Sequence, residues 1–265
     1  MRNRIYILTA VHNDLEDTKK LLSSIYAQTF KDVEVFLVDD GSTDGTSKYI
    51  KSNYPKVNVI EGDGNLWWTA SLNLGLKKIL EKAKEDDFVW IINNDCFFNK
   101  DVLGKLLLFV KNFKGKKNIV GSIVLDAKTK RVFESGVKIN WRKLKFKQSN
   151  LKKGEKIDAL PTKGTLYPVK AFKELSLFDA KHFPHYFSDY EYTIRAKRSG
   201  YRLLICPASK IYNRSERTGK NSLSFSKKSK INPLLQLNIV RVACPKKYRL
   251  KCYILLISKL IHGRR

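Results

Sequence analysis

The chain has 265 residues, of which 43% are hydrophobic and 11% aromatic, and this composition excludes intrinsic disorder, while the length suits one large α/β domain or a domain with an appendage. Its 52 basic and 25 acidic side chains give a formal net charge of +27, which indicates an anionic partner such as nucleic acid, a phosphate-bearing substrate or an acidic membrane surface. The four cysteines form no CxxC pair and have few histidines nearby, so a zinc site is disfavoured and free thiols in a reducing cytoplasm are expected.

The N-terminal part of the chain alternates strand-like and helix-like segments. Asn13 is expected to cap the first helix, with Glu16 completing a capping box three residues later. An order of βαβαβαβ predicts a doubly wound parallel sheet whose ligand-binding loops lie along one edge. The predicted strands are 5–11, 33–38, 57–60 and the run that begins at 88, and the helices cover 15–25, 43–54 and 68–84.

The pattern changes after a predicted helix at 101–113. A basic, weakly patterned segment at 141–156 is expected to be a mobile loop, and the Ser- and Lys-rich segment 214–230 a linker. Residues 231–265 are basic and helical in pattern. The other predicted elements are strands at 119–125, 132–139, 164–169 and 203–206, and a helix at 189–200.

The stretch 88–95 begins as an apolar run and ends in Asn93, Asn94 and Asp95. Such a run is typical of a parallel strand buried on both faces, and in open α/β sheets ligands bind beyond the carboxyl ends of these strands. A carboxylate beside two amides can hold a hard divalent cation together with a phosphate. The alternative is a polar turn that only caps the strand.

Asp39 and Asp40 stand at the end of the second predicted strand, directly before a helix. Paired aspartates at this place can accept hydrogen bonds from a nucleobase and from ribose hydroxyls. The alternative is an Asp-rich helix cap, which Ser42 and Asp44 could supply by themselves. Because one carboxylate would suffice for a cap, two adjacent ones favour ligand binding.

Five motifs, in order, resemble those of family-two glycosyltransferases with the GT-A fold. Val-Asp-Asp-Gly-Ser-Thr-Asp-Gly-Thr at 38–46 is similar to the nucleotide-binding signature, and 24–30 is similar to the run that precedes it. Segment 64–75 resembles the Gly-Asn…Asn-x-Gly motif, and 93–95 falls where the family carries its DXD-type metal motif. Segment 164–201 resembles the acceptor-side Glu-Asp motif, especially in rhamnosyltransferase-like members, and the match reaches about Tyr212.

The resemblance implies a GT-A domain over residues 1–213: a doubly wound, mostly parallel sheet with helices on both faces, followed by the linker and a basic helical extension. It implies that 1–98 binds a nucleotide-diphosphate sugar and that 99–213 binds a glycan or lipid-linked glycan acceptor. A divalent cation, Mn²⁺ or Mg²⁺, would be held by Asp95, and transfer would invert the anomeric carbon. The implied contacts to the nucleotide sugar are Thr9, Asp39, Asp40, Gly64, Asn65, Asn73, Asn93 and Asn94.

The resemblance also implies that Asp189 is the catalytic base. It stands at the start of a predicted helix, whose dipole keeps it ionised unless burial raises its pKa. Glu191 would be its structural or acceptor-binding partner. Two positions depart from the family pattern: Ser188 replaces the usual Glu, and Asn213 stands where many members have a histidine that can reach the metal.

The C-terminal segment carries an apolar stripe at helical spacing among many basic residues, from Leu250 to Ile261. It suits a helix lying on an anionic membrane, and equally a helix packed on the catalytic domain with a solvated basic face. With no apolar signal region and no run of membrane-spanning length, we expect a cytoplasmic protein, possibly peripheral on the inner face of the cell membrane.

Two other functions are compatible with parts of the sequence. A non-catalytic protein that binds anionic membranes or nucleic acid would explain the charge, but it predicts basic residues grouped on one element, whereas here they are spread along the chain. No specific nucleic acid is therefore expected. A sugar-phosphate nucleotidyltransferase would need a Gly-rich basic phosphate loop after the first strand, and residues 10–14 are not one.

Overall fold

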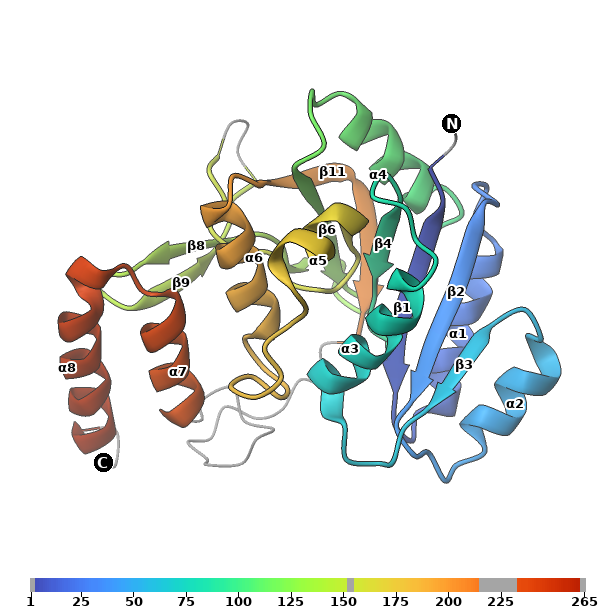
Figure 1. Cartoon of the computed structure of the whole chain (residues 1–265), viewed down its shortest axis with the longest axis horizontal. Coiled ribbons are helices and arrows are strands. Elements are labelled where there is room, and N and C mark those ends of the chain that lie inside the picture. The colour runs from blue at the N-terminus through green and yellow to red at the C-terminus, as the bar shows by residue number, and fades with distance from the viewer. Residues whose placement is uncertain (1–2, 152–154, 215–232, 263–265) are drawn as a thin grey trace.

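The computed structural model describes residues 3–151, 155–214 and 233–262. A nine-stranded sheet forms its centre, with the order β3-β2-β1-β4-β10-β6-β11-β5 and with β7 paired to β6 beside this path (Figure 1). The strands of this sheet are β1 (Ile5–Val11), β2 (Val33–Asp39), β3 (Asn58–Glu61), β4 (Phe88–Ile91), β5 (Cys96–Phe98), β6 (Asn118–Asp126), β7 (Val132–Glu134), β10 (Thr165–Pro168) and β11 (Arg202–Asn213).

Strand direction confirms the predicted mostly parallel sheet. The pairs β1–β2, β1–β4 and β2–β3 are parallel, as is β6–β11. β10 runs antiparallel between β4 and β6, so β6 and β4 point the same way. β5 is antiparallel to the end of β11, which brings Asn213 opposite Cys96.

Helices cover both faces of the sheet, as predicted (Figure 1). Side chains of β1 alternate between two cores: Ile5 and Ile7 pack with α1, α2 and α4, whereas Tyr6 and Leu8 pack with α3, α5 and α6. Each core is apolar and closed to solvent, which fixes the strand register because a slip of one residue would exchange the two faces. The helices are α1 (Leu15–Tyr26), α2 (Thr46–Asn53), α3 (Trp67–Leu80), α4 (Val102–Lys111), α5 (Val169–Leu175) and α6 (Ser188–Arg198).

The predicted cap of α1 is wrong. Asn13 has a φ of 50°, and its Oδ1 accepts a hydrogen bond from the Thr43 amide at 2.7 Å instead of binding α1. The amide of Leu15, in the first turn of α1, donates to Asp44 Oδ2 at 3.0 Å. Asp44 also accepts from the Thr46 amide at the start of α2 at 3.1 Å, so one carboxylate serves both helix starts, which a local motif could not reveal.

Three predictions for the second half need correction. The strand expected at 132–139 is two, β7 and β8 (Val137–Asn140), because the chain leaves the main sheet at Gly136, where a Cβ would lie 2.6 Å from Ile205 Cδ1. The segment 141–156 is not simply a loop, since it contains β9 (Lys145–Gln148), which pairs with β8. The closing strand β11 extends to residue 213, well past 206.

Two helices, α7 (Pro233–Ala243) and α8 (Lys246–His262), follow on the side of α6 (Figure 1). Leu235 and Ile239 of α7 pack with Phe183 and with Ile194 of α6, and Cys252 and Leu256 of α8 pack with α7. The linker predicted at 214–230 lies, except for its first residue, outside the described residues. In the part of the chain that the structure describes, no helix is both long and apolar enough to cross a bilayer.

Candidate active site

The predicted donor-site residues lie where three parallel strands end. β1 and β2 are in register up to Val11 and Asp39, and Leu8 of β1 lies opposite Ile91 at the end of β4. The loops that follow these strands therefore share the carboxyl edge of the sheet, which is the ligand edge of open α/β folds.

Asp40 holds the neighbouring loop together. Its Oδ1 accepts the amides of Gly64 at 2.9 Å and Leu66 at 3.2 Å, and its Oδ2 accepts the amide of Trp67 at 2.9 Å. Three amides from residues 64–67 thus use both carboxylate oxygens. Asp40 thus shapes the 62–67 loop, and its predicted contact with the base or ribose stays a prediction.

Asp39 keeps one oxygen available. Its Oδ1 accepts the Ser42 amide at 2.9 Å, while its buried Oδ2 has no hydrogen-bond partner among the described residues. A buried carboxylate oxygen without a partner is costly, so it points to a ligand that is bound in function. Of the two adjacent aspartates, Asp39 is the better candidate to accept hydrogen bonds from the nucleotide.

Gly64 and Asn65 lie on the loop that Asp40 holds. Gly64 has a φ of +87°, and a Cβ on Gly41 would lie 2.8 Å from the Gly64 Cα, so both positions require glycine for the two backbones to approach. Asn65 is exposed, and its amide donates to Asp63 at 2.9 Å. This loop presents its backbone at the carboxyl edge of the sheet, and its contact with the nucleotide stays a prediction.

Thr9 and Asn73, both predicted to contact the nucleotide, differ in their hydrogen bonding, and this difference could not be predicted from the sequence. Thr9 is fully buried in β1, and its Oγ1 has no partner among the described residues. Asn73 clamps the backbone of Phe178, with Nδ2 donating to the carbonyl at 2.8 Å and Oδ1 accepting the amide at 3.1 Å. Asn73 therefore ties α3 to the loop before α6, and its predicted contact with the nucleotide stays a prediction.

Asn93, Asn94 and Asp95, here called the triad, follow β4 at the same edge. Asn94 Nδ2 donates to Asp14 Oδ2 at 2.9 Å, which fixes that side chain. Asn93 is half-buried, and its Oδ1 is buried without a partner among the described residues. Asp95 is half-buried and directly precedes β5.

Asn213 lies against Asp95. It is 1% exposed, its Nδ2 lies 3.4 Å from the Asp95 carbonyl oxygen, and its Oδ1 has no partner among the described residues. The described residues contain no group of three or more His, Cys, Asp or Glu side chains that could hold a metal. Asp95, with the amide oxygens of Asn93 and Asn213, could still supply the hard oxygen ligands that Mg²⁺ or Mn²⁺ takes, with the remainder coming from phosphate.

Asp189 lies in the first turn of α6. Its Oδ1 accepts the Tyr190 amide at 2.8 Å, and its Oδ2 accepts the Thr162 amide at 3.4 Å. Burial of the carboxyl, together with the negative charge of Glu134, raises the pKa of Asp189 to about 7 despite these backbone bonds. Burial therefore outweighs the helix dipole, and the group can exchange protons near neutral pH.

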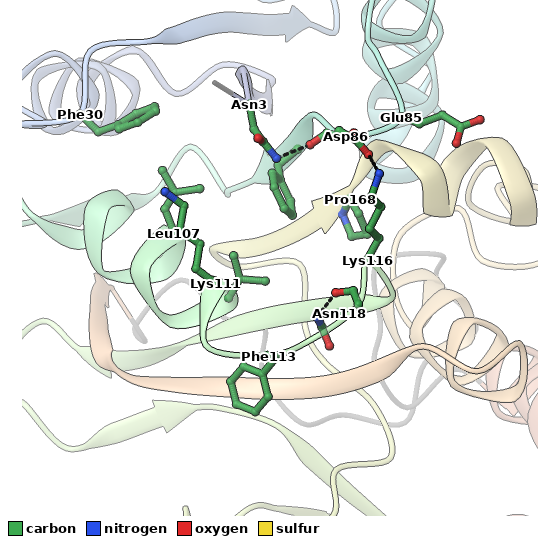
Figure 2. Close-up of a pocket in the computed structure, with 13 residues that line it drawn as sticks. Asn3, Phe30, Glu85, Asp86, Leu107, Lys111, Phe113, Lys116, Asn118 and Pro168 are labelled. Carbon is green, nitrogen blue, oxygen red and sulfur yellow. Dashed lines mark hydrogen bonds and ion pairs between the residues drawn. The ribbon is translucent and has the colours of Figure 1, made fainter. Parts of the chain in front are cut away.

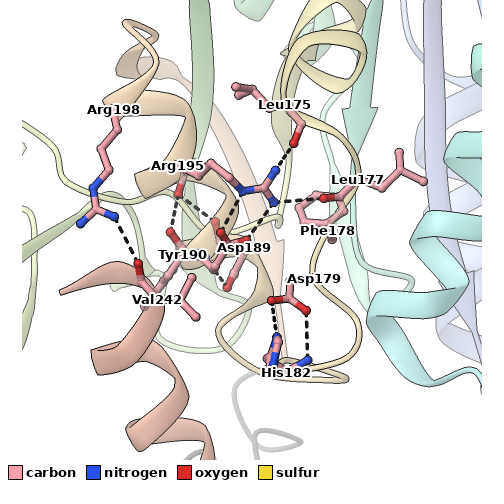
Figure 3. A network of polar contacts seen from close by, with 12 residues as sticks. Leu175, Leu177, Phe178, Asp179, His182, Asp189, Tyr190, Arg195, Arg198 and Val242 are labelled. Atoms are coloured by element: carbon pink, nitrogen blue, oxygen red, sulfur yellow. Dashed lines mark hydrogen bonds and ion pairs between the residues drawn. The ribbon is translucent and has the colours of Figure 1, made fainter. Parts of the chain in front are cut away.

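Both carboxylate oxygens of Glu191 are bound by an arginine of the same helix. Glu191 is 3% exposed, and Arg195 donates to its Oε1 at 2.8 Å and to its Oε2 at 2.9 Å. The same guanidinium donates to the carbonyls of Leu175 and Leu177, so the pair ties α6 to the end of α5 (Figure 3). We assign Glu191 a positioning role.

The acceptor-side loop is fixed to its surroundings. Asp179 accepts the His182 amide at 3.0 Å and contacts its Nδ1 at 2.7 Å (Figure 3). Thr69 of α3 donates to the Phe183 carbonyl at 2.6 Å, and Asn238 of α7 donates to the His182 carbonyl at 3.1 Å. The loop therefore links donor-side helix α3 to the C-terminal helices.

A cavity of about 580 Å³ lies away from all of these residues (Figure 2). Its lining includes Asn3 before β1, Phe88 at the start of β4 and Asn118 at the start of β6. These are the amino ends of the parallel strands, so the cavity lies at the opposite edge. We place the site by its unpartnered polar groups and not by this cavity.

The fold is an open α/β sheet with a polar site at its carboxyl edge. Carboxylate and amide oxygens without partners among the described residues lie on one side of this site, and the buried carboxyl of Asp189, with a pKa near neutrality, lies on the other. The family model for glycosyl transferase family 2 matches residues 6–176, about two thirds of the chain. The chain therefore belongs to glycosyl transferase family 2.

Curated relatives match parts of the chain. The N-acetylglucosaminyl-diphospho-decaprenol L-rhamnosyltransferase of Mycobacterium tuberculosis is 30% identical over 95 residues, which is 34% of this chain and 31% of that protein. An uncharacterized glycosyltransferase of Rickettsia bellii is 26% identical over 181 residues, 66% of this chain and 25% of that protein. The matched segments thus span a third or less of the relatives.

Solved structures share the fold. S. aureus TarS 1–349 in complex with UDP has a TM-score of 0.64 at 15% identity, over 97% of this chain and 71% of that one. GalNAc-T7 with UDP, GalNAc and Mn²⁺ gives 0.67 at 14%, over 95% and 54%. The mannosyltransferase PcManGT from Pyrobaculum calidifontis with GDP-Man and Mn²⁺ gives 0.61 at 15%, over 100% and 89%. The predicted GT-A fold is confirmed.

Proposed function

We propose that this glycosyltransferase transfers its sugar with inversion of the anomeric carbon, using Asp189 as the general base. The observation that carries the proposal is a carboxyl group with a pKa of about 7 at the ligand edge of the sheet. A base whose pKa lies near the working pH combines adequate ionisation with adequate proton affinity. Glu191, bonded through both oxygens to Arg195, leaves Asp189 as the better of the two acidic candidates.

In this mechanism Asp189 takes the proton of an acceptor hydroxyl as that oxygen attacks the anomeric carbon of the donor. The bond from this carbon to the diphosphate oxygen breaks, and its electron pair leaves with the nucleoside diphosphate. Attack from the face opposite the leaving group inverts the configuration. Asp39 Oδ2 and the 64–67 backbone would bind the nucleotide and hold the donor in line.

A divalent cation would relieve charge on the diphosphate, which is worth several kcal/mol in comparable reactions. Asp95 would hold it, with Asn93 and Asn213 as neutral oxygen ligands. Two similar structures, GalNAc-T7 with UDP, GalNAc and Mn²⁺ and PcManGT with GDP-Man and Mn²⁺, support this choice. Residues 1–98 would then be the donor half and 99–213 the acceptor half of one continuous domain.

We further propose a lipid-linked saccharide as the acceptor, with α8 resting on an anionic membrane. α8 has two apolar faces: Cys252 and Leu256 pack inward, whereas Leu250, Ile254 and Ile257 are 74%, 58% and 52% exposed. No acidic residue occurs after position 216, so the outer face of α8 combines apolar and basic side chains with no negative charge. A second copy would bring lysines against lysines, whereas an anionic bilayer neutralises them. The Mycobacterium relative, whose name includes diphospho-decaprenol, supports this acceptor class.

Thermal unfolding of the protein with a panel of nucleotide sugars, with and without Mn²⁺, tests the donor proposal. A ligand that binds only the folded state raises the apparent stability, by about 2.7 kcal/mol at a hundredfold excess over its Kd. The selected donor is then used for transfer, and the anomeric configuration of the product is read by NMR. A retained configuration, or no stabilisation by any donor, would contradict the proposal.

Flotation with vesicles tests the membrane proposal. A variant with Leu250, Ile254 and Ile257 changed to Ser should lose binding to vesicles that contain phosphatidylglycerol, because it loses the apolar side chains that enter the interface. Leu108→Ser is the matched control, since Leu108 is 67% exposed on α4 and outside the proposed face. Self-association through α8 without vesicle binding would show that a second copy occupies this face instead.

A further inference from the structure

The loop at 161–165 lies between the triad strand and the proposed base. The Gly164 amide donates to the carbonyl of Ile91, the last residue of β4, at 2.9 Å. Two residues earlier, the Thr162 amide reaches Asp189 Oδ2 at 3.4 Å. Lys163 is therefore held between the strand that leads to Asp95 and the carboxylate of Asp189.

The loop is fixed at Gly164. This residue has a φ of +71°, and a Cβ there would lie 1.9 Å from Ile211 Cδ1, so no larger residue fits. Its carbonyl accepts a hydrogen bond from the buried Ser122 Oγ at 2.7 Å. The direction in which the chain presents Lys163 is thus set by β4, β6 and β11 together.

Lys163 is a buried cation. Its side chain is 13% exposed, its Nζ lies 3.4 Å from Glu134 Oε2, and it lies 4.9 Å from the centre of the Phe133 ring. Burial opposes its charge, but the carboxylates of Glu134 and Asp95 help to raise the pKa of Lys163, so it stays protonated. At 3.4 Å the Glu134 contact is longer than a charge-assisted hydrogen bond of about 2.7–2.9 Å, so the ammonium keeps capacity for an anionic ligand.

We propose that Lys163 is a donor-binding residue whose ammonium contacts the diphosphate of the nucleotide sugar. This inference rests on the proposed function. When the bond from the anomeric carbon to the diphosphate oxygen breaks, its electron pair adds one negative charge to the leaving group, and Lys163 takes up part of that charge. Glu134 holds the ammonium in place before the donor arrives.

The charge of the site explains why such a cation is needed. The triad contains one carboxylate, Asp95, and the nearby Asn213 is neutral, so within the part of the chain that the structure describes this site offers a cation one carboxylate and neutral amide oxygens. A fixed ammonium supplies positive charge to the diphosphate without the coordinating side chains that a metal ion needs. Its presence also disfavours a divalent cation in the absence of donor phosphate, because like charges repel.

Nucleotide affinity tests the inference without relying on turnover. UDP, GDP and dTDP are titrated calorimetrically, with and without Mn²⁺, and the tightest of them is used with its parent nucleoside. Lys163→Met should weaken the diphosphate about 10- to 100-fold, as expected for loss of a hydrogen bond to a charged group, and leave nucleoside affinity unchanged. Lys163→Arg should retain most of the affinity. The increase in diphosphate affinity that Mn²⁺ causes should be larger in Lys163→Met than in the wild type.

Lys170→Met is the matched control, because Lys170 is also partly buried and paired with Glu85 and Glu174, yet lies on α5. It should bind the diphosphate as the wild type does. Unchanged diphosphate affinity in Lys163→Met, or equal losses for the diphosphate and the nucleoside, would overturn the assignment while leaving the proposed function intact. If the wild type bound none of the three diphosphates, the proposed function and this inference would both fail.

Discussion

Replacing Asp189 by Asn should lower activity and raise stability at the same time. The pKa of Asp189 lies near 7 against an ordinary value of 3.8, because burial and Glu134 disfavour its charged form. The folded state therefore binds the proton more tightly than the unfolded state, and stability falls as the pH rises from about 4 to about 7. A pKa shift of this size corresponds to a loss of at most about 4 kcal/mol in the free energy of unfolding.

Because Asp189 keeps some contact with solvent, we expect the ionised carboxylate to lower the free energy of unfolding by about 1–2 kcal/mol. Asn carries no charge, so the variant should unfold about 2–8 °C higher than the wild type at pH 8 and at nearly the same temperature at pH 4. Transfer should fall about 10²- to 10⁴-fold through loss of the base, with donor affinity unchanged.

Thermal unfolding at both pH values, calorimetric donor titration and a transfer assay together check this prediction. Asp86→Asn is the control, since Asp86 is 58% exposed and pairs with Lys116 away from the ligand edge, and it should change neither property. Wild-type transfer by Asp189→Asn would refute the base assignment. A lower unfolding temperature at pH 8 would refute the argument from burial.

Three further variants separate the roles of neighbouring groups. Glu134→Gln removes a negative charge that raises the pKa of Asp189, so the acidic limb of the kcat/KM profile should move to lower pH; an unmoved limb would contradict the coupling. Asp95→Asn should abolish the Mn²⁺-dependent part of donor binding in calorimetry, while metal-free binding persists. Asn73→Ala removes both hydrogen bonds to the Phe178 backbone and should lower the free energy of unfolding, measured with a chemical denaturant, by about 1–3 kcal/mol. Weaker nucleotide binding with unchanged stability would instead support the predicted contact of Asn73 with the donor.

The N-terminal part of the sheet was predictable because its signals are local. Each of β1, β2 and β4 is an apolar run of strand length that is followed by polar residues, and a helical face follows β1 and β2 directly. The hairpin of β8 and β9 was not predictable, since Phe146 and Trp141 find their apolar partners on α7 and α8, about a hundred residues later. Short strands whose stability depends on distant partners carry little pattern of their own.

The site was predictable as a set of residues more than as a set of roles. Asp39 and Asp40 look alike in sequence, but neighbouring residues at a strand end point in different directions, so one retains an unpartnered oxygen and the other binds three amides. Lys163 gave no signal at all, because it is one of 52 basic residues. Only the contacts of Thr162 and Gly164 on either side set it apart.

These contacts bear on the order in which ligands bind. Before the donor arrives, the triad side offers one carboxylate, Asp95, and neutral amide oxygens, with the ammonium of Lys163 near enough for the two charges to interact. With these charges, a divalent cation should bind the free protein only weakly. A nucleotide sugar brings a diphosphate with two negative charges and further oxygen ligands, so the cation should enter with it. Mn²⁺ affinity measured by EPR should therefore rise steeply when the nucleoside diphosphate is added, and tight binding of Mn²⁺ to the free protein would show that the protein's own ligands suffice.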